Sequence, residues 1–360
     1  MTTLRSEAVL PRAAVPDPAP WPRQQTREPW FDNIKMGLVV LVVVGHCWAL
    51  LPTTTGTSWA YDFLYSWHMP AFAIITGYFS RGFTWTPRRL WSLVATVVVP
   101  YVVFEYSLSW FREGVGSMKM HNLLFDPHWP MWYLCALFFW RLAAPVFGRL
   151  PRPAALGTAV AISLSAGFFA PTTFDFGRIL GFLPFFVLGL HVGTREWRRV
   201  RSSSAVPWAL AGLAAVFVLA RFTDVWISKD WYYYTARYHL LGAGGLPAVL
   251  DRAGVMTIGL VGALCFFALV PRRRSWFSAL GSATLVVYLF HGFFVQYAKY
   301  AGFGDWARGH LLLAFTLGTA SAICLALALA APPVSRRLSV ATDPLGALQR
   351  RLRAAGPTTA

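Results

Sequence analysis

A lysine and a histidine lie eleven positions apart in an otherwise apolar stretch: Lys35 and His46. In a helix, eleven residues make about three turns, so both side chains project on roughly the same face, about 16 Å apart along the axis. An ionisable side chain inside a membrane span costs at least about 2.5 kcal/mol, so such residues usually face a cavity and serve a function. The alternative is structural, with Lys35 extending to the membrane surface and His46 bonded to a neighbouring helix.

Two more histidines, His68 and His291, and the carboxylate Glu105 also lie within apolar stretches. Such a set can bind metal, relay protons or perform acid–base catalysis. Zinc sites usually show close ligand pairs such as i, i+4, and none is present near these histidines, so we predict no metal. A proton-coupled transporter remains the alternative function, although duplicated halves and interrupted helices in matched positions are absent. Acid–base catalysis requires a neutral histidine close to a hydroxyl group.

The composition places these residues in a lipid bilayer. Hydrophobic residues make up 56% of the chain and charged residues 13%, against about 25% charged residues in soluble domains. Apolar runs close to the length of a membrane span recur along the chain. We predict an all-α integral membrane protein of ten transmembrane helices at residues 34–51, 61–79, 90–110, 129–145, 154–169, 179–192, 206–221, 246–270, 279–298 and 311–334.

Basic residues set the orientation of these helices. With a cytoplasmic N-terminus, cytoplasmic segments hold 22 of the 32 Lys and Arg residues, outside segments hold nine, and Lys35 lies within the first span. This positive-inside pattern predicts that both termini are cytoplasmic. It explains the net charge of +17 without a nucleic-acid partner. Omitting the fifth and sixth spans together preserves the alternation, so eight spans remain an alternative.

The organisation follows from these spans. We predict a flexible basic tail over residues 1–29, a membrane domain over 30–334 and a second flexible basic tail over 335–360. The excess of Arg over Lys, with abundant Ala, suggests a bacterial plasma membrane. The sequence does not indicate an oligomeric state.

The predicted topology brings three histidines to one depth. His46 and His291 lie about twelve residues from the cytoplasmic ends of their helices, or roughly 18 Å. His68 lies near 20 Å from the inner face in a hydrocarbon core about 30 Å thick, and Glu105 is slightly higher. The sequence therefore predicts a polar chamber near the middle of the membrane.

Ordered motifs resemble the membrane acyltransferase 3 family. The stretch from Trp30 to Lys35, followed by His46, resembles that family's opening, whose hallmark is Arg or Lys, ten residues and then His. The block from Trp67 to Phe79 resembles the run FHMPxFFxxSGYF, with departures at positions 67, 73 and 76. The most similar branch is the sugar O-acetyltransferases related to fucose 4-O-acetylase. Further matching blocks are Pro100-Tyr101, Trp132-Tyr133-Leu134, Arg178 with Phe182–Gly189, and Gly281-Ser282 with Tyr288–His291.

The resemblance implies transfer of an acyl group, usually acetyl from cytoplasmic acetyl-CoA, to a hydroxyl of a carbohydrate or related acceptor. No bound cofactor is implied, because acyl-CoA is the donor substrate. His46 would be the essential histidine and Lys35 its basic partner, as a point charge without the fork of arginine. His46 would remove the hydroxyl proton, and a covalent acetyl-His46 intermediate is a variant.

Other residues are candidates for stabilising the oxyanion, orienting His46 and binding the two substrates. Tyr288, Trp132 or His291 could stabilise the oxyanion, and Glu105 or His68 could orient His46. Thr76, Tyr101 and Arg178 are substrate-binding candidates from the motif blocks. The candidates for the nucleotide end of CoA are the loop arginines Arg88, Arg89, Arg149 and Arg152.

One short motif match has no functional meaning in this chain. His121 and Asp126 match the H-x4-D pattern of glycerolipid acyltransferases, but they fall in a predicted outer loop, across the bilayer from acyl-CoA. Two fixed residues recur easily by chance, so we interpret the match as coincidence.

Overall fold

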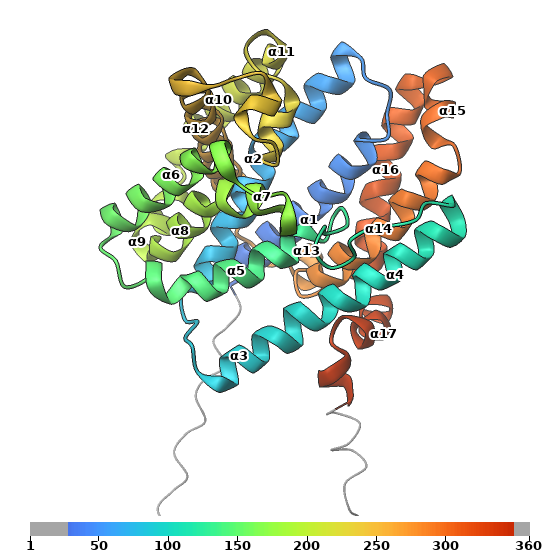
Figure 1. The fold of residues 1–360 in the computed structure, drawn as a ribbon, viewed down its shortest axis with the longest axis horizontal. Helices are drawn as coiled ribbons and strands as arrows, with labels where there is room; N and C mark the ends of the chain where they lie inside the picture. The colour runs from blue at the N-terminus through green and yellow to red at the C-terminus, as the bar shows by residue number, and fades with distance from the viewer. Residues whose placement is uncertain (1–27, 349–360) are drawn as a thin grey trace, which may run out of the picture.

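The computed structural model describes residues 28–348, and every regular element among them is a helix (Figure 1). The predicted N-terminal tail lies outside the described residues, apart from Glu28 and Pro29. The elements are α1 (Pro29–Trp48), α2 (Thr55–Ser80), α3 (Pro87–Leu93), η1 (Val94–Val98), α4 (Val99–Gly116), α5 (Trp132–Phe147), α6 (Arg152–Phe169), η2 (Thr173–Asp175), α7 (Phe176–Gly181), α8 (Leu183–His191), α9 (Thr194–Val200), α10 (Ala205–Ala220), α11 (Thr223–Trp226), η3 (Lys229–Tyr233), η4 (Tyr238–Leu241), α12 (Gly245–Leu269), α13 (Trp276–Leu280), α14 (Thr284–Tyr300), α15 (Phe303–Gly309), α16 (Leu311–Ala330) and α17 (Pro332–Thr342).

All ten predicted segments overlap helices, but fewer helices have the length and composition of a membrane span. Among residues 28–348, five qualify: α1, α3 to α4 as one helix, α6, α12 and α16. The count rises to seven if two bent pairs, η2 and α7 with α8, and α9 with α10, each form one span. α5 and α14 have only 16 and 17 residues, whereas crossing the hydrocarbon core takes about 20. The count of ten spans therefore remains a prediction.

Helix α1 lies at the centre of the fold. It packs against α2, α13, α14 and α16, and it is the most buried of the five candidate spans, whereas α16 is the least buried. Figure 1 shows α1 and α2 between two groups of helices, α5 to α12 on one side and α13 to α16 on the other. A residue in the second half of α1 is therefore shielded on most sides by protein rather than lipid.

Two glycines let α2 and α8 pack with their backbones in contact. A Cβ atom at Gly77 would lie 1.9 Å from the carbonyl oxygen of Phe186, and one at Gly189 would lie 1.9 Å from that of Ile74. Small residues at such positions allow membrane helices to approach closely. Any larger residue would push the helices apart, and α2 carries Thr76 next to Gly77.

The first turn of α1 is attached to the segment between α12 and α14. The Asn33 side chain donates to the carbonyl oxygens of Pro271 and Arg273, at 2.8 and 3.2 Å. The Ser278 hydroxyl donates to the Asn33 side-chain oxygen at 2.8 Å, and Gly281 packs against the backbone of Asp32. These contacts fix the helix that carries Lys35 and His46.

The described residues continue beyond the last candidate span. α17 packs against α14 and α16, so the predicted C-terminal tail is helical from residue 335 to Thr342. Residues 349–360 lie outside the described residues.

Candidate active site

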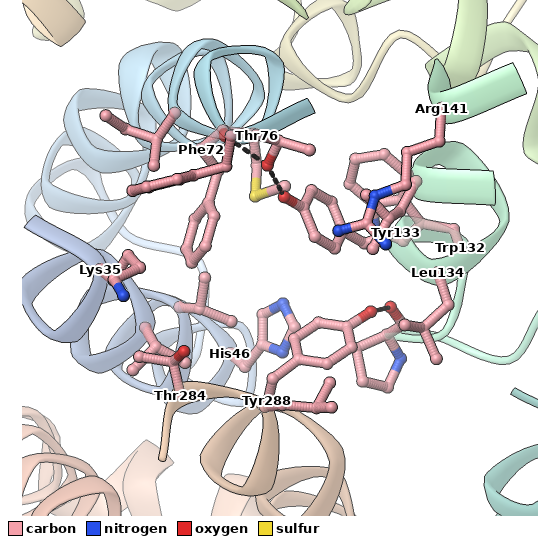
Figure 2. A pocket seen from close by; sticks show the side chains of 18 residues that line it. Lys35, His46, Phe72, Thr76, Trp132, Tyr133, Leu134, Arg141, Thr284 and Tyr288 are labelled. Atoms are coloured by element: carbon pink, nitrogen blue, oxygen red, sulfur yellow. Dashed lines mark hydrogen bonds between the residues drawn. The ribbon is translucent and has the colours of Figure 1, made fainter. Parts of the chain in front are cut away.

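A cavity of about 220 Å³ lies between α1, α2, α5 and α14 (Figure 2). We call it the central cavity. It extends about 16 Å along α1, because Lys35 and His46 both line it and are eleven residues apart. Most of its wall is apolar. Its polar and charged lining residues are Lys35, His46, Thr76, Trp132, Tyr133, Arg141, Thr284 and Tyr288.

His46 and His291 form a buried hydrogen-bonded pair, with 3.0 Å between His46 Nδ1 and His291 Nε2. His291 Nδ1 lies 3.1 Å from the carbonyl oxygen of Val287. A carbonyl oxygen only accepts, so His291 Nδ1 carries the proton and a neutral His291 accepts at Nε2. His46 therefore donates from Nδ1, and its other nitrogen, Nε2, is left unprotonated. This assignment follows from the bonding pattern, and it gives the histidine of the central cavity the form that a base requires.

The loop of residues 117–131, between α4 and α5, covers this pair. The Trp129 ring lies 4.1 Å from the His46 ring, centroid to centroid, at an angle of 36°. The Tyr288 hydroxyl donates to the carbonyl oxygen of Pro130, the next residue. Trp129 was not a predicted site residue. It stood at the start of the predicted span 129–145, whereas α5 begins at Trp132, and its contact with α1 depends on how the loop folds. The loop thus holds an aromatic ring against the candidate base.

Glu105 holds this loop rather than His46. Its carboxylate is fully buried, and both oxygens accept from the backbone N–H of His128, at 2.9 and 3.1 Å. Burial, with the nearby Arg112 charge, lowers the pKa of His128 to about 4, so the neutral ring accepts from Arg112 at 2.6 Å. Glu105 and His68 were expected to orient His46, but the residue hydrogen-bonded to His46 is His291.

We expect Glu105→Leu to destabilise the protein by about 1–3 kcal/mol, because the buried His128 N–H would lose its acceptor. Displacement of Trp129 should also reduce the turnover of any reaction at His46. The measurement is thermal unfolding in detergent. Glu113→Leu is the matched control, because Glu113 is an exposed residue of the same helix, 4.0 Å from Lys119, and such surface pairs contribute little. Equal unfolding temperatures for Glu105→Leu and wild type would contradict this role.

Two cations line the end of the central cavity away from His46. Lys35 Nζ lies 2.7 Å from Asp32 Oδ1 and 5.5 Å from the Phe79 ring. Arg141 is nine residues beyond Trp132 on α5, or about 14 Å further from the His46 end. Arg141 was not among the predicted site residues, although its position inside the predicted span 129–145 was a usable signal of function.

The hydroxyls of Thr76 and Tyr133 form a hydrogen-bonded pair in the lining of the central cavity. The Thr76 hydroxyl donates to the carbonyl oxygen of Phe72 at 2.8 Å, so the Tyr133 hydroxyl donates to Thr76 Oγ1. Tyr133 was part of a motif block but not a predicted site residue. The hydroxyl protons of Tyr133 and Tyr288 are therefore both engaged by the protein.

Several predicted site residues lie outside the lining of the central cavity. His68 Nδ1 lies 2.8 Å from the carbonyl oxygen of Leu64 in its own helix. The Tyr101 hydroxyl donates to the carbonyl oxygen of Leu124, in the 117–131 loop, at 2.9 Å. Arg178 pairs with Asp175 at 3.3 Å and lies 5.0 Å from the Trp132 ring. The loop arginines are also outside it: Arg88 and Arg89 exposed, Arg149 against Trp85, and Arg152 paired with Glu196.

Comparisons with known proteins identify the family of the chain. Residues 28–331 match the model of the acyltransferase 3 family, which describes an acyltransferase domain. The chain is 26% identical over 327 residues to Nodulation protein NolL of Sinorhizobium fredii (strain NBRC 101917 / NGR234), covering 82% of this chain and 86% of the relative. No solved structure matches. Because the family model spans most of the chain and includes both Lys35 and His46, the protein belongs to the acyltransferase 3 family.

Proposed function

We propose that this membrane acyltransferase moves an acetyl group from cytoplasmic acetyl-CoA to a hydroxyl of a carbohydrate or related acceptor, with His46 as general base. The observation that carries the proposal is the bonding of His46 to His291, which leaves His46 Nε2 free to take a proton. The fucose 4-O-acetylase-like branch remains the best description of the chain's motifs.

The shape and charge of the central cavity suit the donor. Its volume of about 220 Å³ corresponds to roughly 15 to 20 water-sized groups, which suits an acyl thioester and part of a thin pantetheine chain. Its apolar wall suits the chain, and the cations Lys35 and Arg141 suit the CoA phosphates at the far end. The nucleotide would extend beyond the cavity, where Arg88, Arg89, Arg149 and Arg152 are candidate contacts.

The topology proposed from the basic residues orients this path. With ten spans and both termini cytoplasmic, the Lys35 end of α1 faces the cytoplasm of a bacterial cell and the His46 end faces outwards. Acetyl-CoA would then enter from the cytoplasm, and the acceptor would approach from the opposite side. Neither substrate would need to cross the bilayer.

The proposed reaction is a direct transfer. His46 Nε2 takes the proton of the acceptor hydroxyl while that oxygen forms a bond to the thioester carbonyl carbon. The carbon–sulfur bond then breaks, and the CoA thiolate takes the proton back from His46. His291 Nε2 continues to accept from His46 Nδ1–H while His46 carries the extra proton, which keeps the ring oriented.

Trp132 is the proposed donor to the oxyanion. The hydroxyl protons of Tyr288 and Tyr133 are engaged by Pro130 and Thr76. Trp132 lines the same cavity, and its indole N–H has no hydrogen-bond partner within residues 28–348. A donor already in place for the developing negative charge stabilises the transition state without reorganisation.

We expect Lys35→Met and Arg141→Met each to raise the KM for acetyl-CoA roughly ten- to hundredfold, the value of a hydrogen bond to a charged group. The kinetics of radiolabelled acetyl transfer measure this. Arg337→Met, which removes an exposed cation on α17, is the control and should leave KM unchanged. An unchanged KM for acetyl-CoA in both variants would mean that the donor binds elsewhere.

The proposal as a whole is tested by acetyl transfer in membranes containing wild type or His46→Ala. Transfer that depends on the histidine supports the enzyme. Movement of an unmodified substrate without acetyl-CoA would instead favour the proton-coupled transporter.

A further inference from the structure

A second, smaller cleft lies beyond His46 along α1, between the end of α1 and the start of α2. Its volume is about 80 Å³, or roughly six water-sized groups. We call it the α1–α2 cleft. Its lining includes Trp48, Thr57, Tyr61, Asp62, Lys229 and Tyr233.

Asp62 is the unusual member of this lining. Its side chain is 2% exposed, and its Oδ1 atom has no hydrogen-bond partner within residues 28–348. Leaving a buried polar atom unpaired costs about 1–3 kcal/mol, and more for a charged group. The neighbouring charges are of both signs, Lys229 and Asp224. The Thr223 hydroxyl is a hydrogen-bond partner of this side chain, so Oδ1 is the oxygen for which a ligand in the cleft would supply a partner.

The rest of the lining combines aromatic rings with hydroxyls. The Tyr61 and Tyr233 hydroxyls are 2.7 Å apart, and Trp48 and Thr57 contribute a ring and a hydroxyl. Aromatic walls with a few well-placed polar groups are typical of small-molecule sites. Here a carboxylate oxygen able to accept from hydroxyl donors, beside rings that pack against C–H groups, suits a sugar ring better than an anion or a lipid tail.

One side chain connects the α1–α2 cleft to the catalytic helix. Tyr65 stacks on Tyr61, with ring centroids 3.9 Å apart, and it abuts Gly45, where an added Cβ would meet the Tyr65 ring at 3.0 Å. Gly45 directly precedes His46. Trp48 follows His46 by two residues, a rise of about 3 Å, so the α1–α2 cleft begins close to the level of His46 along the helix axis.

We propose that the α1–α2 cleft binds one ring of the acceptor carbohydrate, with Asp62 accepting hydrogen bonds from its hydroxyls. This inference rests on the proposed function and assigns the acceptor side of the same reaction. The small volume restricts contact to the polar edge of a single ring. The rest of a larger acceptor would remain outside.

The test is the isosteric variant Asp62→Asn, in full-length protein in lipid nanodiscs. The probes are labelled acetyl-CoA and methyl glycosides of glucose, galactose, mannose and fucose. We expect the acceptor KM to rise about tenfold or more, equivalent to about 1.4 kcal/mol, with the KM for acetyl-CoA unchanged. Asp305→Asn, which alters an exposed carboxylate paired with Arg308, should change neither value.

Binding of the same glycosides, followed by intrinsic tryptophan fluorescence, separates this inference from the proposed function. Saturable binding by wild type that is lost in Asp62→Asn supports the subsite, even if no acetyl transfer occurs and the proposed reaction fails. Acetyl transfer with an acceptor KM unchanged in Asp62→Asn would overturn the subsite and leave the reaction standing. Absence of saturable glycoside binding by wild type would also overturn it.

Discussion

Replacing His46 with alanine should lower the rate constant for acetyl transfer by about 10²–10⁴, the usual contribution of a general base. The reason is specific to this site, because His46 Nε2 is the unprotonated nitrogen of the only histidine lining the central cavity within residues 28–348. The KM for acetyl-CoA should change little, because Lys35 and Arg141 remain. Initial rates at saturating donor and acceptor measure the effect.

The control for this variant is His239→Ala, which removes an exposed histidine on η4 and should leave the rate unchanged. Membrane insertion and thermal unfolding of both variants must match wild type, so that loss of fold is not mistaken for loss of chemistry. Full activity in a folded His46→Ala protein would remove His46 from the mechanism.

The second large effect is expected at His291. His291→Leu removes the acceptor of His46 Nδ1–H, so His46 can adopt either tautomer and loses its orientation. Loss of the group that orients a catalytic histidine lowered turnover about 10⁴-fold in the serine-protease triad. We expect a fall of about 10²-fold or more in the rate constant, with unchanged KM for acetyl-CoA.

Partial rescue distinguishes this positioning role from a purely structural one. His291→Gln keeps an acceptor oxygen, so it should recover part of the rate lost in His291→Leu. The measurement is the rate constant of both variants beside their unfolding temperatures. If His291→Gln and His291→Leu lose the same activity, or if activity follows only stability, the hydrogen bond to His46 is not what matters.

The helices, and the pairing of Lys35 with His46 on one helix, could be predicted from the sequence because both depend on local information. Apolar runs indicate membrane helices, and the spacing of Lys35 and His46 along one helix depends only on helix geometry. The partner of His46 was not accessible in the same way. His291 is 245 residues away along the chain, and its contact depends on how α14 packs against α1.

The residues that were missed share this dependence on packing. Trp129 reaches His46 because a loop folds back over the cavity, held by the bond from His128 to Glu105. Glu105 was singled out because a carboxylate within an apolar stretch signals a structural or functional partner, but the sequence does not say which backbone group it accepts from. Arg141 lay within a predicted span but was not singled out, because the sequence does not show that it lines the same cavity as Lys35.

The glycines illustrate the same limit. Gly77 and Gly189 belong to matching motif blocks, and the packing of α2 against α8 gives the reason that no larger residue fits at either position. A motif identifies such positions, but only the structure shows that each glycine faces the other helix's backbone.

The most direct test of the proposed acetyl transfer uses sealed inverted vesicles. They are supplied with acetyl-CoA that carries separate labels on the acetyl group and on the CoA moiety. Acetyl-CoA is supplied outside, at the face proposed to be cytoplasmic, and a methyl glycoside is enclosed. We expect that wild type moves the acetyl label onto the enclosed glycoside as an ester while the CoA label stays outside, and that His46→Ala does not. Entry of both labels together, or loss of unmodified glycoside without acetyl transfer, would contradict it.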